Sequence, residues 1–154
     1  MDRKIIIAQP KDADIVSEIT QITIHTVYPK YYPEGAVEFF SRHHSMDKIV
    51  SDIENGNVYL LDVDGRSVGT VTISENHINR LFVLPDCQHQ GFGKALMDFA
   101  EEKIFSSFDT IELDASFPAK KIYLKRGYTE VEYNVIDAVN GDHLCYDVMR
   151  KTRS

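Results

Sequence analysis

The chain has 154 residues, of which 43% are apolar and 27% charged, and its formal net charge is −7. This length predicts one domain with its own core over residues 1–154, and the composition excludes a disordered chain. The acidic balance argues against nucleic acid as a partner, and without an apolar run of bilayer length we expect no membrane partner. The charge suits a cationic small substrate, although solubility alone also explains it.

The first third of the chain predicts one strand followed by helices. Apolar residues at 5–8 indicate a short strand, and helical spacing indicates a helix over 13–25. Pro29 and Pro33 then interrupt the chain, and apolar positions from 37 to 53 indicate further helical material. We therefore expect a helical insert between the first two strands.

The remaining sequence predicts strands that surround two helices. Segments 58–63 and 67–73 are rich in β-formers and flank Asp64-Gly65, a strong hairpin signal. Further strands are expected at 78–84, 110–115, 129–136 and 144–151, and helices directly after Gly93 and at 119–125. The strands at 78–84 and 110–115 flank one helix and predict a parallel pair. The fold class is thus α/β (α+β), a mixed, mostly antiparallel sheet with a central βαβ unit and flanking helices.

The junction after the strand at 78–84 is the most informative segment. Gly91 and Gly93 let the backbone turn tightly and approach a ligand closely, and the first amides of the following helix have no partner within it. Free amides and the positive helix end attract anions, so the junction predicts a phosphate site.

Two families of phosphate loop can be compared with this junction. A Walker loop is excluded, because only Phe92 separates the glycines and Ala95 follows Lys94 where a hydroxyl residue is needed. A dinucleotide fingerprint stays open as an alternative. Leu96 stands where it needs a small residue, whereas Glu112 lies at about the expected distance downstream.

A third pattern matches at every position. Gln88-His89-Gln90-Gly91-Phe92-Gly93 follows an apolar strand and a proline, and it fits Gln/Arg-x-x-Gly-x-Gly/Ala. Segment 116–128 is similar to Asn-x-x-Ala-x-x-x-Tyr-x-x-x-Gly-Phe/Tyr, with Ser116 in place of the asparagine. In this order the two motifs resemble those of the GNAT superfamily of N-acetyltransferases.

The resemblance implies acetyl-CoA as the acetyl donor and direct transfer to a primary amine. In this family the strand that carries the loop and the strand after the helix splay apart, and the pantetheine arm lies in the opening. The implied cofactor-binding residues are Leu81, Phe82, Val83, Gln88, His89, Gln90, Gly91, Phe92, Gly93, Lys94, Ala95, Ser116 and Ala119. The backbone of the first three would pair with pantetheine, and the loop would cradle the pyrophosphate.

The resemblance also implies the catalytic side chains. Tyr123 stands where the family uses a phenol to protonate the departing thiolate, and its ordinary pKa near 10 keeps it a donor at neutral pH. His77 lies where some members place a base, with Glu75 as the nearby alternative. A solvated turn explains both residues equally, and many members use no dedicated base.

The acceptor would be a small-molecule or peptide amine that the sequence does not identify. Tyr28, Tyr31 and Tyr32 lie in the helical insert, where this fold recognises its substrate, and could wall a cleft for an amine. A proline-stiffened surface loop explains these tyrosines equally. A binding module that has lost turnover, or a dinucleotide-binding oxidoreductase, remains an alternative function.

The last expectations concern setting and assembly. Two cysteines, Cys87 and Cys145, without a secretory signal suggest a reduced, cytoplasmic setting. His43 and His44 are adjacent and point apart on a helix, so no metal site is predicted. A homodimer through the final strands stays open.

Overall fold

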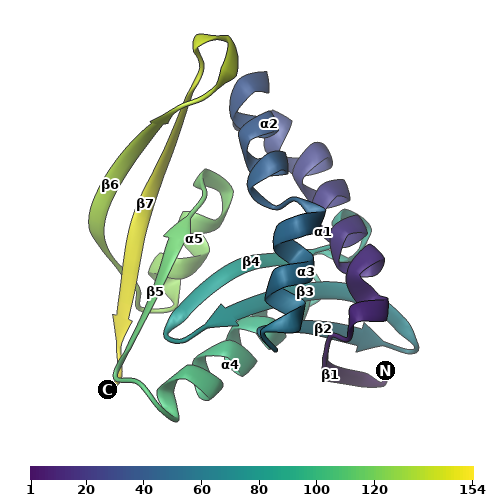
Figure 1. Ribbon diagram of the computed structural model, residues 1–154. Coiled ribbons are helices and arrows are strands. Elements are labelled where there is room, and N and C mark those ends of the chain that lie inside the picture. Colours follow the sequence, from purple (N-terminus) through teal and green to yellow (C-terminus); the bar gives the residue numbers. More distant parts are fainter.

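A seven-stranded sheet carries the fold, in the spatial order β1-β2-β3-β4-β5-β7-β6 (Figure 1). The computed structural model describes every residue from Met1 to Ser154. The strands are β1 (Arg3–Ile7), β2 (Val58–Val63), β3 (Arg66–Ser74), β4 (His77–Val83), β5 (Thr110–Ala115), β6 (Thr129–Asp137) and β7 (His143–Thr152). The helices are α1 (Ala13–Val27), α2 (Glu34–His43), α3 (Met46–Glu54), α4 (Phe92–Phe105) and α5 (Phe117–Lys125), with short turns η2 (Tyr28–Lys30), η3 (Pro85–Cys87) and η4 (Val139–Gly141).

The strand pairing confirms the predicted fold class. Every neighbouring pair is antiparallel except β4 and β5, which flank α4 as the central βαβ unit. A dinucleotide-binding fold needs a repeated parallel pattern, so that alternative is wrong. The helical material expected from 37 to 53 forms two helices, because Ser45 is extended, with φ −67° and ψ 163°, and ends α2 before α3 begins.

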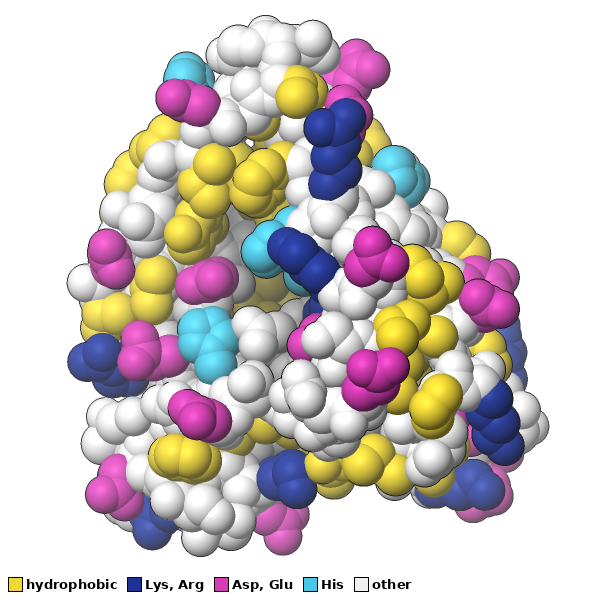
Figure 2. Space-filling model, viewed as in Figure 1, with side chains coloured by type: hydrophobic (Ala, Val, Ile, Leu, Met, Phe, Trp, Pro, Cys, Tyr) yellow, Lys and Arg dark blue, Asp and Glu magenta, His cyan; other side chains and the backbone are white.

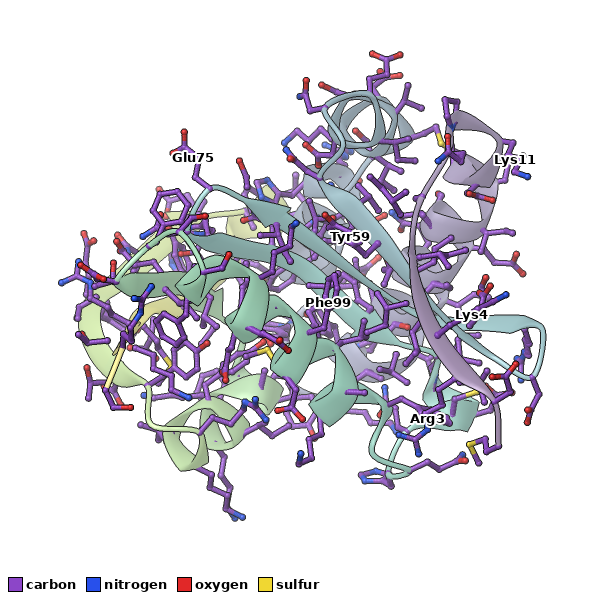
Figure 3. All side chains as sticks on the ribbon, turned by 90° about the horizontal axis from the view of Figure 1, so that it is seen from below. Arg3, Lys4, Lys11, Tyr59, Glu75 and Phe99 are labelled. Atoms are coloured by element: carbon purple, nitrogen blue, oxygen red, sulfur yellow. The ribbon has the colours of Figure 1, made fainter.

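The central strands are covered on both faces. All residues of β3 from Val68 to Ile73 are buried, and alternate residues of a strand point to opposite faces. Helix α1 packs against β3 and β4, and α4 packs against the same strands. Beneath the sheet, the Tyr59 ring of β2 meets the Phe99 ring of α4, with centroids 4.9 Å apart (Figure 3). The core therefore fixes α4 against the strand that precedes it in the chain.

Strands β4 and β5 separate soon after they pair. Their register contains two pairs, His77 with Glu112 and Ile78 with Leu113. Beyond this point β4 has a bulge at 80–81, opposite a single residue of β3. A bulge bends and twists its strand, so one edge of β4 faces an opening instead of β5.

The second arm of the molecule consists of β5, β7, β6 and α5, and its hairpin tip reaches α2 (Figure 1). The Gly35 amide donates to Oδ2 of Asp142 at 2.8 Å. A Cβ at Gly35 would lie 2.2 Å from the carbonyl oxygen of Val139, so this contact requires glycine. The two arms thus meet again above the opening. No helix in the chain has the length and apolarity needed to cross a membrane.

Candidate active site

A cavity of about 770 Å³ occupies the opening between β4 and β5. Figure 2 shows a hollow on this face, with apolar, histidine and cationic side chains around it. One wall comes from α1, α2, α3 and β4, and the other from β5, α5, β6 and β7. The cavity therefore has the shape that the splayed strands were expected to create.

One end of the cavity is formed by the loop that enters α4. His89 and Gly91 have positive φ values of 63° and 84°, which turn the chain sharply before the helix. The backbone amides from His89 to Lys94 have no acceptor within the protein. The Gln88 side chain donates to the carbonyl oxygen of Val83 at 3.0 Å and holds the loop against the end of β4. Consecutive free amides at a helix N-terminus form a binding site for an anion such as a phosphate.

The two glycines serve this loop in different ways. Gly91 supplies the left-handed backbone, which a residue with a side chain adopts only with strain. A Cβ on Gly93 would lie 4.0 Å from Val83, which is ordinary contact distance, so packing does not require glycine there. The missing side chain instead keeps the Gly93 amide open toward the cavity. Ala95 is outside the cradle, because its amide donates to the carbonyl of Gly91 at 3.0 Å.

A partly exposed ionic network joins α4 to the end of α5 beside this loop. Arg126 donates to Asp98 at 2.7 Å and to Glu101 at 2.9 Å, while Lys94 donates to Asp98 at 2.8 Å. Burial opposes ionisation of Glu101, but hydrogen bonds from Arg126 and Tyr128 outweigh it and hold its pKa below the ordinary value. Two cations, the exposed Lys94 and the well-anchored Arg126, therefore line the cavity next to the free amides.

Tyr123 lies between the two ends of the cavity. It projects from α5, is 9% exposed and lines the cavity wall. Burial raises its pKa to about 12, against a smaller opposite effect of the nearby Arg126 charge. The phenol is therefore protonated throughout the neutral range and able to donate.

Aromatic side chains line the far end of the cavity. Tyr28 meets Phe40 edge to face at 4.6 Å and lies 6.2 Å from the Phe82 ring. Burial raises the pKa of Tyr28, with a smaller opposite effect from the side chain of Ser116. These rings give this end of the cavity an apolar floor.

His44 extends this floor toward α3. Its ring lies 5.7 Å from the ring of Phe82, and its Nδ1 is buried without a hydrogen-bond partner. Burial, followed by the charge of Arg80, lowers the pKa of His44 to about 3. The imidazole is neutral at physiological pH and can accept a hydrogen bond, but it cannot hold a proton there.

Arg80 lies at the bulge of β4 with its side chain 3% exposed. Its φ is +44°, an unusual value for a residue with a side chain, and such strain concentrates at functional sites. The guanidinium donates to Thr72 at 2.9 Å and forms an ion pair with Asp52 of α3 at 3.0 Å. Its Nε is buried without a partner. A single charged residue in an apolar strand was the sequence signal that could have marked this position.

The structure brings most of the predicted site residues to the cavity. Those that line it are Leu81, Phe82, Val83, Gln88, His89, Gly93, Lys94, Ser116, Ala119, Tyr123 and Tyr28. Gln90 and Gly91 contribute free amides to the loop, while the Phe92 side chain is 3% exposed and packs beneath Arg3.

Besides Ala95, four predicted residues lie elsewhere. His77 pairs with Ser74 and Glu112 at the start of β4 and does not line the cavity. Glu75, the alternative base, projects outward from the turn between β3 and β4 (Figure 3). Tyr31 is 53% exposed, and the Tyr32 hydroxyl accepts from the Phe117 amide at 2.5 Å, so it fastens α5 instead of lining the site. Neighbouring tyrosines of one loop therefore have different surroundings.

Comparison with known proteins agrees with this geometry. The family model described as acetyltransferase (GNAT) domain matches residues 27–152. No curated protein matches the chain.

Solved structures share the fold at low sequence identity. A GCN5-related N-acetyltransferase from Rhodopseudomonas palustris superposes with a TM-score of 0.89 at 23% identity, over 99% of this chain and 96% of that one. The paia N-acetyltransferase from Thermoplasma acidophilum, in complex with coenzyme A, has a TM-score of 0.72 at 21% identity over 99% of both chains. The Salmonella typhimurium protein yncA, with its cofactor acetyl-CoA, has a TM-score of 0.74 at 16% identity, over 100% of this chain and 95% of that one.

Proposed function

We propose, from the premise that the chain belongs to the GNAT acetyltransferase family, that it transfers an acetyl group from acetyl-CoA directly to a primary amine. The observation that carries the proposal is the run of free amides from His89 to Lys94 at one end of a cavity whose wall is the unpaired edge of β4. Residues 1–154 would form one catalytic domain, and the free cysteines suit a cytoplasmic setting.

The residues at this end fit the chemical groups of acetyl-CoA. The amides from 89 to 94 and the Lys94 ammonium would hold the pyrophosphate, and the backbone of 81–83 would pair with the pantetheine arm. Acetyl-CoA supplies the thioester carbonyl that the amine attacks. The bulge at Arg80 directs the edge of β4 into the cavity, so backbone groups are available to orient this carbonyl.

The reaction needs one proton acceptor and one proton donor. An ammonium first loses a proton, and the neutral nitrogen then forms a bond to the carbonyl carbon as the carbon–sulfur bond breaks. Tyr123 donates its proton to the departing thiolate and regains one from the amine nitrogen, which leaves an amide, CoA and one released proton. Because its pKa is high, Tyr123 carries its proton at neutral pH and so cannot remove the first proton from the ammonium.

We assign the first deprotonation to water beside Asp114 and not to His77, which does not line the cavity. Asp114 of β5 lines the cavity, and its carboxylate has no hydrogen-bond or ion-pair partner within the protein. Its carboxylate attracts the ammonium and orients it, and solvent in the open cavity takes the proton.

The test is an assay for product with acetyl-CoA and a panel of primary amines. CoA thiol release is followed by absorbance, and mass spectrometry identifies the acetylated amine. We expect both signals to rise together for at least one amine and to fall sharply in Tyr123→Phe. Binding of acetyl-CoA with no product from any amine would instead support the module without turnover.

A further inference from the structure

The charges of the cavity differ from those of the whole chain. The chain is acidic, with a net charge of −7. Its cavity, however, is lined by more cations than carboxylates: Lys48, Arg80, Lys94, Lys125 and Arg126 against Asp52 and Asp114. Lys94 of α4, with Lys125 and Arg126 at the end of α5, belong to the end with the free amides, the phosphate end. The opposite, aromatic end is the acceptor end, and its charges are those of α3, β4 and β5.

Two of the charges at the acceptor end neutralise each other. Asp52 is bound to the guanidinium of Arg80 at 3.0 Å. This leaves Lys48 and Asp114 as the available pair. Lys48 contacts only the Nδ1 atom of His43, at 3.3 Å, and keeps donors free, while Asp114 has no partner. The site thus presents one cation and one anion from opposite arms of the molecule.

These opposite charges surround the same pair of histidines. Burial lowers the pKa of His43, the charges of Lys48 and Arg80 lower it further, and Asp114 acts in the opposite direction. Both imidazoles are thereby kept neutral and add no charge of their own. An ammonium and a carboxylate can consequently be bound at separate points of this end without competing histidine cations.

Two buried polar atoms at this end also lack a hydrogen-bond partner. In the whole chain, the buried side-chain nitrogens and oxygens without a hydrogen-bond partner are Nδ1 of His44 and Nε of Arg80. Both residues line the cavity. Buried polar groups in proteins are normally satisfied, and an unsatisfied one calls for a ligand or a water. The Arg80 Nε–H needs an acceptor, and because this atom is buried, a carboxylate in the cavity reaches it through a bridging water and not directly.

We propose that the acceptor is an amine that also carries a carboxylate, that is, an amino acid, with its ammonium beside Asp114 and its carboxylate beside Lys48. This inference rests on the proposed acetyl transfer. The apolar side chains of Phe40, Ile136 and Leu144 lie at the same end and suit an apolar side chain of the acceptor. A polycation such as a polyamine needs several free carboxylates, and the cavity offers one.

The experiment compares each amino acid with the amine that differs from it only by loss of the carboxylate. The pairs are L-leucine with isopentylamine, L-phenylalanine with phenethylamine, and γ-aminobutyrate with propylamine, with spermidine as the polycation. We expect kcat/KM for at least one amino acid to exceed that of its partner by about tenfold or more. Equal or higher kcat/KM for the carboxylate-free amines, or for spermidine, would overturn the proposal.

Single substitutions test whether Lys48 and Asp114 recognise the carboxylate and the ammonium of the acceptor. Lys48→Met should lower kcat/KM for the amino acid about tenfold and leave its carboxylate-free partner within twofold, whereas Asp114→Asn should lower both. Lys11→Met is the matched control, because Lys11 projects away from the cavity (Figure 3), and it should change neither. Equal losses for both substrates in Lys48→Met would overturn the assignment of the carboxylate site.

Calorimetric binding of acetyl-CoA separates this inference from the proposed function. If acetyl-CoA binds and simple amines are acetylated without any preference for carboxylates, the amino-acid inference alone is wrong. If acetyl-CoA does not bind and no amine is acetylated, the proposed function is wrong and the inference falls with it.

Discussion

The two ends of the cavity are formed by different parts of the chain, one by backbone groups and the other by side chains. The phosphate end consists mainly of backbone amides from one continuous loop, residues 89–94, and its geometry follows from two glycines and a helix start. The acceptor end consists of side chains from α2, α3, β4 and β5, held by the ion pair of Arg80 and Asp52. Backbone recognition suits a constant group such as a pyrophosphate. Recognition by side chains can change with a few substitutions, so proteins of the same fold can differ in the acceptor that they bind.

The largest expected effect concerns Tyr123, which lies between the two ends. Tyr123→Phe removes the proton donor and keeps the ring, so we expect kcat to fall by roughly 10²-fold or more. Binding of acetyl-CoA and of the acceptor should stay within about twofold of wild type. Steady-state kinetics and calorimetry measure the two effects separately. Tyr31→Phe, at an exposed position outside the cavity, is the control, and a wild-type kcat in Tyr123→Phe would remove the donor from the mechanism.

The ion pair tests how far the acceptor end depends on side chains. Asp52→Asn leaves the guanidinium of Arg80, whose side chain is 3% exposed, without its counterion. We expect a loss of roughly 2–3 kcal/mol in the free energy of unfolding, since a buried charge without its partner is costly. Denaturant titration measures it. The double variant Arg80→Met with Asp52→Asn should recover part of the loss, and a single variant as stable as wild type would show that the pair is not structural.

His44 makes the stability of the acceptor end depend on pH. Its folded pKa of about 3 lies below the value of about 6.5 in the unfolded chain, so the unfolded state binds the proton first. The stability contributed by neutral His44 is complete above about pH 6.5 and is lost as the pH falls toward 3, by up to about 2 kcal/mol at pH 5. Unfolding at pH 7.5 and pH 5 should show a smaller difference in His44→Phe than in wild type. His25→Gln, at an exposed position of α1, is the control, and an unchanged difference in His44→Phe would contradict the buried neutral imidazole.

The smallest expected effect is that of Gly93→Ala, which should change the phosphate end of the cavity and leave the acceptor end unchanged. Gly93→Ala places a methyl group at the free amides but 4.0 Å from Val83, so the fold accommodates it. We expect acetyl-CoA affinity to fall about tenfold, or ~1.4 kcal/mol. The melting temperature should stay the same or rise, because alanine favours a helix more than glycine does. The KM of the acceptor should not change, and a lower melting temperature with unchanged acetyl-CoA affinity would reverse the assignment.

This difference also explains what the sequence could predict. The hairpin at Asp64-Gly65, the central βαβ unit and the phosphate loop follow from local signals, because each depends on neighbours in the chain. The position of Tyr123 in the cavity wall followed from the family motif, whose spacing preserves the geometry of α5. Even there, local reasoning extended the cradle by one residue, since Ala95 already donates its amide within the helix.

The acceptor end could not be predicted in this way. Asp52, Arg80 and Asp114 come from three elements that are distant in sequence, and only the folded chain brings them to one cavity. The positive φ of Arg80 arises from the bulge in β4, which no local pattern marks. The prediction that His77 acts as the base rested on its distance along β4. At that point β4 is still paired with β5, so His77 lies in the closed part of the sheet and not at the opening.

The most direct test of the account is calorimetric titration of the protein with acetyl-CoA and, in parallel, with NAD at low salt. We expect saturable binding of acetyl-CoA, about tenfold weaker in Gly93→Ala, and no binding of NAD. Absence of acetyl-CoA binding, or equal binding of NAD, would contradict the claim that the free amides at the start of α4 form a cradle for the pyrophosphate of CoA.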